Sequence, residues 1–160
     1  MWTHLPEKLD KALKEELNIL GKVAYLISPN KLHHLFLSEW ISAYPNAKCY
    51  ASPALVAKRR DIKFIKELSN SPENEWADEI KQTVFQGSPI MQEVVFFHIK
   101  SKTLILTDLI ENFHLSALNW WQKTLACCAG ILSPDGKTPI DWSISFLFGK
   151  TKARTSLDNA

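Results

Sequence analysis

The fold is decided by the stretch KVAYLISPNKLHH (residues 22–34), in which an apolar run changes at once into a polar one. Residues 22–27 have the length and continuity of a buried strand, and Pro29 ends that strand because proline cannot donate to the ladder. Polar side chains at the carboxyl end of a strand are where open α/β folds build their sites. The stretch therefore predicts a buried strand followed by the edge of a functional site.

A second stretch, KTLILTDL (residues 102–109), repeats this arrangement, because an apolar strand pattern leads into Thr107, Asp108 and Leu109. Histidine nitrogens and carboxylate oxygens are common ligands of catalytic zinc. The two stretches together leave two interpretations. The chain is either a metal-dependent hydrolase or a protein that has the fold of one without its metal site.

Strand and helix patterns alternate around the first stretch. Leucines at helical spacing predict a helix over residues 6–20, which Gly21 ends as a C-cap. Residues 32–44 return to helical spacing, residues 47–51 form a second short strand, and residues 53–60 form a further helix. Strand, helix, strand and helix at this spacing predict parallel strands with right-handed crossovers.

The second half of the chain carries the clearest β pattern. Residues 66–79 are polar and are expected to form a surface loop with a short helical turn. Three strands are expected after it: residues 80–85, 92–99 and 102–107. The last two form a hairpin through the two residues between them. An apolar helix is then expected over residues 115–132, and a helix with a basic outer face over residues 142–157.

The composition is that of an ordinary globular protein with one domain over residues 1–160. The formal net charge of +2 is too small to indicate nucleic-acid binding, and no basic stripe with interleaved aromatic residues accompanies it. No run approaches the roughly 18 to 20 apolar residues of a membrane helix. The first residues lack the charged-then-apolar order of a signal peptide. We therefore expect a cytoplasmic protein with neither a nucleic-acid nor a membrane partner.

The cysteines favour a reducing compartment, because the chain has three of them and no CxxC spacing. Cys127 and Cys128 stand in an apolar helical stretch, so we expect them to be small buried hydrophobic residues. A cysteine nucleophile would need a base and an electropositive setting, and nothing near Cys49 or Cys127 indicates either.

Beyond these patterns, particular residues of the two stretches resemble the metallo-β-lactamase superfamily, which includes ribonuclease Z and hydroxyacylglutathione hydrolase. The resemblance covers most of the chain, and it is specific in residues 29–40 and 93–112. More narrowly, the chain resembles a branch described only as a domain of unknown function. The resemblance implies an α/β fold, a four-layer αββα sandwich, which we expect to be incomplete at both ends of this chain.

The superfamily binds two metal ions through a His-x-His-x-Asp-His motif, which spans residues 29–34 here. Only the last position matches, at His34. Pro29 and Lys31 stand at the two earlier histidine positions, and His33 stands at the aspartate position. Lys31 also brings a positive charge to the place of a cation, and this repulsion opposes metal binding.

Of the later ligands in the superfamily pattern, the bridging aspartate matches at Asp108, whereas the loop at residues 87–92 lacks the expected histidine. The last histidine ligand follows a late strand that this chain does not reach. A dinuclear site needs about five to six protein ligands. His33, His98 and Glu93 are the residues that could be recruited, but His98 and Glu93 point to opposite faces of one strand.

Each of these residues also has a structural interpretation. One of the rings of His33 and His34 can pack while the other hydrogen-bonds a loop carbonyl, and His98 can be a hydrogen-bonded strand residue. Asp108 can accept backbone N–H groups of the segment that it begins. Because so few ligand positions match, we expect the chain to bind no metal. The alternative is a single divalent ion such as zinc, iron or manganese.

Two functions remain open on the sequence. The first is a degenerate metallo-β-lactamase-like protein with weak or no hydrolase activity, in which His34 and Asp108 would hold the metal for an ester, thioester or phosphodiester substrate. The second is a non-catalytic binding or scaffolding domain whose cleft holds a small anion or a protein partner. That cleft would be lined by Asn30, Lys31, His33, His34, Glu93 and Asp108.

Overall fold

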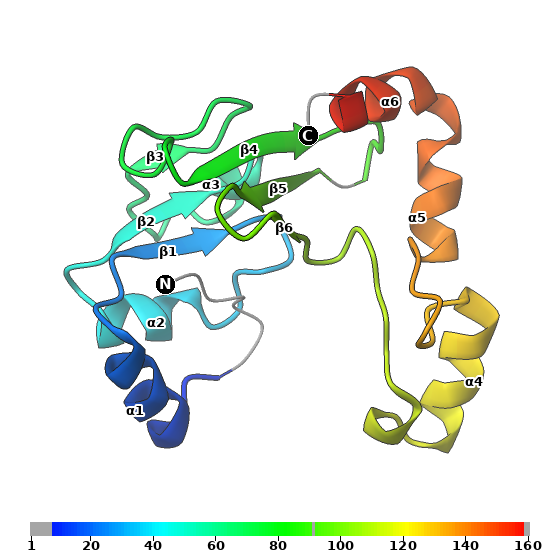
Figure 1. Cartoon of the computed structure of the whole chain (residues 1–160), viewed down its shortest axis with the longest axis horizontal. Coiled ribbons are helices and arrows are strands. Elements are labelled where there is room, and N and C mark those ends of the chain that lie inside the picture. The colour runs from blue at the N-terminus through cyan, green and yellow to red at the C-terminus, as the bar shows by residue number, and fades with distance from the viewer. Residues whose placement is uncertain (1–7, 91, 159–160) are drawn as a thin grey trace. The chain divides into compact units, whose positions relative to one another are not determined.

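The computed structural model describes residues 8–90 and 92–158, and within them the chain is a mixed α/β protein with six α-helices and two three-stranded sheets (Figure 1). The chain divides into an N-terminal unit that ends at Ser71 and a C-terminal unit that begins at Pro72. The single domain over residues 1–160 stays a prediction. Across the described ranges, no helix combines the length and the apolar character that a membrane crossing requires.

The N-terminal unit is built on a parallel sheet with the order β1-β2-β3. Its strands are β1 (Tyr25–Ser28), β2 (Lys48–Ala51) and β3 (Lys66–Glu67). The predicted parallel pairing of the first two is confirmed, with Ser28 opposite Ala51. The sequence did not predict β3, because its two residues are polar and exposed and carry no strand pattern.

Three helices accompany this sheet: α1 (Lys11–Leu20), α2 (Leu37–Ala43) and α3 (Leu55–Lys58). The Asp10 side chain caps α1 by accepting from the Leu13 N–H at 2.8 Å, and Gly21 ends the helix as expected. The predicted start of this helix at Pro6 lies outside the described residues. The second and third helices are shorter than expected, because residues 31–36 form turns and Ala54 has a left-handed backbone.

The core of the N-terminal unit lies between the sheet and its helices. It consists of Leu17, Val23, Leu26, Leu37, Trp40 and Cys49. Leu17 comes from α1, and Leu37 and Trp40 come from α2, so each helix buries part of its apolar residues. The expectation of one buried apolar face is only partly met, because Leu20, Leu32 and Leu35 are 72%, 50% and 75% exposed. This packing fixes the backbone of β1 and β2 and therefore the positions of the loops that follow them.

The C-terminal unit is built on an antiparallel sheet with the order β4-β5-β6. Its strands are β4 (Ile80–Phe85), β5 (Glu93–His98) and β6 (Thr103–Ile105). The predicted bounds of the first strand and the predicted hairpin are confirmed. The turn is longer than the two residues expected: it covers residues 99–102 and contains Lys102 with a left-handed φ of 52°.

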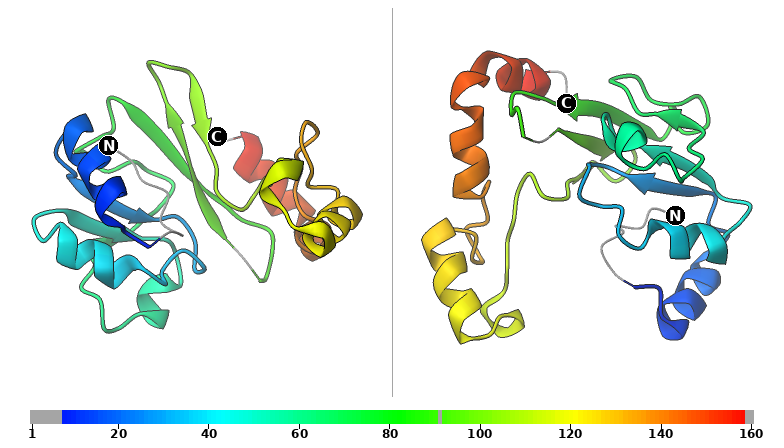
Figure 2. Two further views of the ribbon diagram at one scale, coloured as in Figure 1. Left: turned by 90° about the horizontal axis from the view of Figure 1, so that it is seen from below. Right: turned by 180° about the vertical axis from the view of Figure 1, so that it is seen from behind.

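Helical segments follow this sheet (Figure 2): η1 (Leu115–Ala117), α4 (Trp120–Ala129), α5 (Ile140–Ser145), η2 (Phe146–Phe148) and α6 (Lys150–Asp158). The single helix expected over residues 115–132 is wrong. Asn119 and Gln122 form a capping box that begins α4, and Gly130 ends it with a left-handed φ of 69°. The expected burial of Cys127 and Cys128 is also wrong, because both are exposed.

The single helix expected over residues 142–157 is instead divided into α5, η2 and α6, and Gly149 lies between η2 and α6. A Cβ atom placed there would lie 1.8 Å from the carbonyl oxygen of Gly87, so only glycine allows this backbone approach. On either side of that contact, Phe146 and Ala153 pack on a core made of Phe85, Val95 and Leu109. The close approach therefore lets α6 lie against β4 (Figure 1).

Candidate functional site

The polar residues that follow β1 in the N-terminal unit are buried and hold one another in place. Ser28 and Asn30 are fully buried, and His33 is 6% exposed. The Ser28 hydroxyl bonds to the backbone carbonyls of Asn30 and His33. The Asn30 Oδ1 atom accepts from the N–H groups of Leu32, at 2.9 Å, and His33, at 3.3 Å. These bonds satisfy the Ser28 hydroxyl and the Asn30 Oδ1 atom, which the turn takes out of water.

Ser52 follows the neighbouring strand and meets this loop at the same sheet edge. Its N–H donates to the carbonyl of Ser28 at 2.9 Å. Its side chain is fully buried, and within the described part of the chain its hydroxyl has no hydrogen-bond partner. The carboxyl ends of β1 and β2 thus meet at one buried polar point, as the sequence predicted for parallel strands.

His34 is held by Arg59, which stands just after α3. The Arg59 Nη1 atom lies 3.0 Å from His34 Nδ1 and 2.8 Å from the His34 carbonyl oxygen. A guanidinium group can only donate, so Nδ1 accepts and the proton of the neutral ring lies on Nε2. Burial, followed by the charges of Lys58 and Arg59, lowers the pKa of His34. This histidine is therefore kept neutral.

Arg59 is itself held by a carboxylate. Its Nε and Nη2 atoms donate to the two oxygens of Asp61 at 2.9 and 2.7 Å. This bidentate bond lowers the pKa of Asp61. The side chain is thereby fixed against His34.

Positive charge gathers where the two loops join. The Lys58 Nζ atom donates to the carbonyl of Lys31 at 3.0 Å, which links the end of α3 to the loop after β1. We call Lys31, Lys58 and Arg59 the basic rim. The Lys58 ammonium group contacts the backbone of Lys31, and the Arg59 guanidinium group contacts His34 three residues further on.

In the C-terminal unit, Glu93 rather than Asp108 organises the second predicted stretch. The Glu93 side chain is 1% exposed. Its Oε1 atom accepts from the N–H of Thr107 at 2.7 Å, and its Oε2 atom accepts from those of Asp108 and Leu109 at 2.9 and 3.1 Å. A carboxylate buried among apolar strands requires such donors. The sequence could have indicated this role of Glu93, because it is the single acid in the strand pattern EVVFFH. The sequence could not show that the N–H groups of residues 107–109 are its partners.

The other predicted residues of this unit have separate environments. The His98 Nδ1 atom lies 2.6 Å from the Ser101 hydroxyl in the hairpin turn, so the prediction of a hydrogen-bonded strand histidine is confirmed. Burial, and then the charges of Asp108 and Asp141, raises the pKa of Glu111. Glu111 thus lies within electrostatic range of Asp108, and it belongs to the segment 93–112 that resembles the superfamily.

The metal that the superfamily resemblance implies does not fit the residues around His34. Arg59 uses the Nδ1 lone pair, Nε2 carries the proton, and cations surround the ring. Of the other proposed ligands, Glu93 is occupied by three amides. Within residues 8–90 and 92–158, no group of three or more histidine, cysteine, aspartate or glutamate side chains could hold a metal ion. His34 and His33 belong to the N-terminal unit, and Asp108, Glu93 and His98 belong to the C-terminal one.

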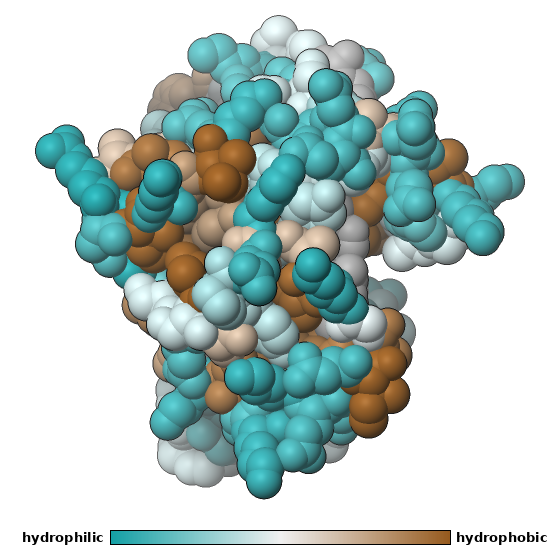
Figure 3. All heavy atoms as spheres, turned by 90° about the vertical axis from the view of Figure 1, so that its left-hand side faces the viewer, coloured by the Kyte–Doolittle hydropathy of each residue, from teal (hydrophilic) through white to brown (hydrophobic). Residues whose placement is uncertain are grey.

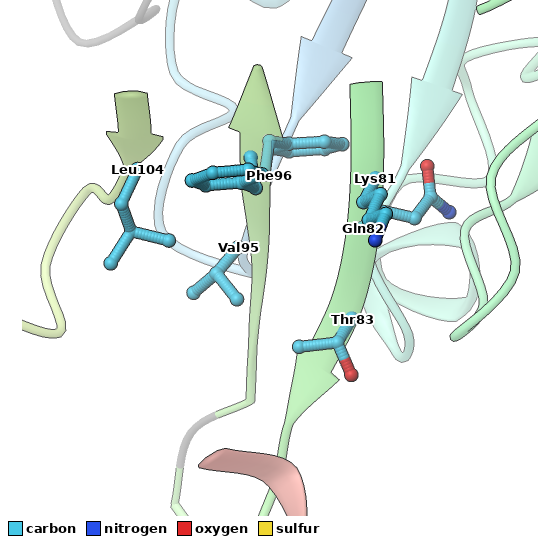
Figure 4. Close-up of a pocket in the computed structure, with 7 residues that line it drawn as sticks. Lys81, Gln82, Thr83, Val95, Phe96 and Leu104 are labelled. Atoms are coloured by element: carbon cyan, nitrogen blue, oxygen red, sulfur yellow. The ribbon is translucent and has the colours of Figure 1, made fainter. Parts of the chain in front are cut away.

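The described cavities lie apart from the basic rim. One, of about 10 Å³, lies over the antiparallel sheet beside Thr83, Val95 and Leu104, and it has room for a single water (Figure 4). A larger one, of about 210 Å³, lies near the amino ends of β1 and β2 beside Val23, Tyr44 and Ala47. Neither is lined by a residue that the sequence selected.

A comparison of the chain with family models, curated proteins and solved structures finds no match in any of the three. The assignment of function therefore depends on the residues themselves.

Proposed function

We propose that this chain is a degenerate metallo-β-lactamase-like protein that works as a binding domain, with the basic rim as its site for a small anion. The proposed fold is an αββα sandwich, and the two small sheets and six α-helices of the described residues support it at the level of an α/β protein. In this proposal the loops after β1 and β2 keep the position of a hydrolase site but not its metal chemistry.

The observation that carries the proposal is the contact between Arg59 and His34. It places a guanidinium group, itself paired with Asp61, on the one histidine that matches the metal motif. Lys58 adds a cation that no carboxylate among the described residues of this site pairs, with its Nζ atom on the Lys31 carbonyl, so the net charge favours an anion over a metal ion. The buried bonds of Ser28 and Asn30 hold the loop still, which lowers the entropy lost on binding.

Inorganic phosphate is the probe for a first test. We expect phosphate titrated into the full chain to shift the NMR signals of residues 30–34 and 58–60 in a saturable way. The double variant Lys31→Ala/Lys58→Ala should lose this response. The matched variant Lys8→Ala/Lys22→Ala, which removes two exposed lysines of the same unit, should keep it.

A metal assay separates this proposal from the hydrolase alternative. Stoichiometric zinc, iron or manganese in the purified chain, lost in the variant His34→Ala/Asp108→Ala, would overturn the anion site and restore a metal centre. A phosphate response equal in both lysine variants would also contradict the proposal, because it would mean that the anion binds without the basic rim.

A further inference from the structure

Helix α5 and the turn η2 in the C-terminal unit carry one apolar stripe that is packed. Trp142 and Phe146 stand four residues apart and pack against the core of this unit. The rings of Phe146 and Phe85 meet edge to face with their centroids 5.5 Å apart. This inner stripe fixes which way the helical segment faces.

A second apolar stripe lies on the opposite side of the same segment and is exposed. Ile140, Ile144 and Leu147 follow at helical spacing and are 57%, 58% and 53% exposed, and Phe148 beside them is 98% exposed. At 100° per residue Ile140 and Ile144 fall on one side of α5, away from Trp142, and the exposed Leu147 and Phe148 follow them in η2. Figure 3 shows another face, where hydrophobic side chains stand scattered among hydrophilic ones, as on most proteins. A continuous stripe of large apolar residues is different and indicates a docking surface.

Three positively charged residues come directly after this outer stripe in the sequence. Lys150, Lys152 and Arg154 of α6 are all exposed, and the acidic residues of these helical segments are Asp141 near their start and Asp158 at their end. The other face of α6 is bound to its own unit, because Ala153 packs on the core and the Ser156 hydroxyl accepts from the Gln86 N–H at 3.1 Å. The three cations are exposed on the parts of α6 outside this packed strip. We call the outer stripe together with these cations the apolar–basic surface.

We propose that the apolar–basic surface docks on the surface of a bilayer that contains anionic lipids. A segment with aromatic and aliphatic residues on one side and lysine or arginine next to them lies in the interface between headgroups and acyl chains. A dense layer of lipid phosphates can neutralise all three cations at once, whereas an acidic protein would need carboxylates at matching positions. This inference is independent of the basic rim, which lies in the other unit.

Sedimentation of the full chain with vesicles tests this inference. We expect the chain to sediment with vesicles of phosphatidylcholine and phosphatidylserine, much less with phosphatidylcholine alone, and less in high salt. Phe148→Asp should abolish the binding. Lys150→Ala/Lys152→Ala/Arg154→Ala, which changes only exposed side chains, should weaken it about a hundredfold.

The matched control is Ile19→Asp, which places the same charge on an exposed apolar residue of α1, 84% exposed in the other unit. It should bind vesicles like the original chain, and circular dichroism should show that all variants keep their secondary structure. The inference is overturned by absence of binding to the anionic vesicles or by equal binding in all variants. It is also overturned if light scattering shows a dimer that Phe148→Asp dissociates, since the surface would then bind a second copy.

Discussion

Each unit of the molecule holds a loop at the end of a strand, but the two loops are organised by opposite means. In the N-terminal unit the loop after β1 is held by neutral groups, the Ser28 hydroxyl and the Asn30 amide. In the C-terminal unit the loop after β6 is held by one buried carboxylate, Glu93. The neutral groups leave the first loop without a charge of its own, so the cations of the basic rim make it favour an anion, whereas the charge of Glu93 is already used by its three amides. The comparison teaches that the first loop is the one suited to binding.

Removal of Glu93 should have the largest effect on stability. Glu93→Ala leaves three backbone N–H groups without their acceptor and opens a cavity, so we expect a loss of about 4 kcal/mol in the free energy of unfolding. Urea denaturation measures this loss. Glu93→Gln, which keeps one acceptor oxygen, should cost clearly less.

A result in which Glu93→Ala costs less than Glu93→Gln would contradict this account of the C-terminal loop. The carboxylate would then be a buried charge that the protein tolerates for another purpose, such as ligand binding, and the two loops would no longer differ in the way described.

The two units also differ in which of their features could be predicted from the sequence alone. Strand β4 and the hairpin were predictable, because alternation and apolar runs report burial directly. The close approach of Gly149 to Gly87 was not predictable, because the two residues are distant in the sequence. The prediction that Cys127 and Cys128 are buried was wrong for a related reason. An apolar pattern shows which face of a helix is hydrophobic, but it does not show whether another part of the fold packs on that face.

The candidate site was predictable only in part. The sequence placed Asn30, Lys31 and His34 in the loop after a strand, but it grouped them with Glu93 and Asp108, which belong to the other unit. It did not anticipate Arg59, because the three basic residues at 58–60 have the pattern of an ordinary solvated face. The contact that decides the charge of the site joins residues 25 positions apart.

Removal of Asn30 should have an intermediate effect. Asn30→Ala takes the acceptor from the N–H groups of Leu32 and His33, so we expect a loss of about 2 kcal/mol in the free energy of unfolding. Thermal and urea denaturation measure it. Asn46→Ala, at an exposed asparagine of the same unit, should change the stability by less than about 0.5 kcal/mol. Equal losses in both variants would show that the loop does not depend on its neutral frame.

The smallest expected effect concerns the proton on His34, and it tests the claim that the first loop carries positive charge. Because the pKa of His34 in the folded chain is lowered, the unfolded chain binds a proton at a higher pH than the folded one. As the pH falls through the ordinary histidine value of about 6.5, protonation therefore favours the unfolded state, and the contribution to stability is lost until the folded ring also protonates. Arg59→Ala should raise the pKa of His34 in an NMR titration and reduce this loss.

Arg60→Ala is the matched control, because it removes the adjacent exposed cation without touching the His34 ring. It should leave the titration of His34 nearly unchanged. Burial is the largest cause of the lowered pKa, so part of the shift should remain in Arg59→Ala. An unchanged pKa in Arg59→Ala would mean that burial alone keeps the ring neutral. The neutral frame of the first loop would then lack the adjacent charge that makes it an anion site, and the difference between the two loops would be one of structure only.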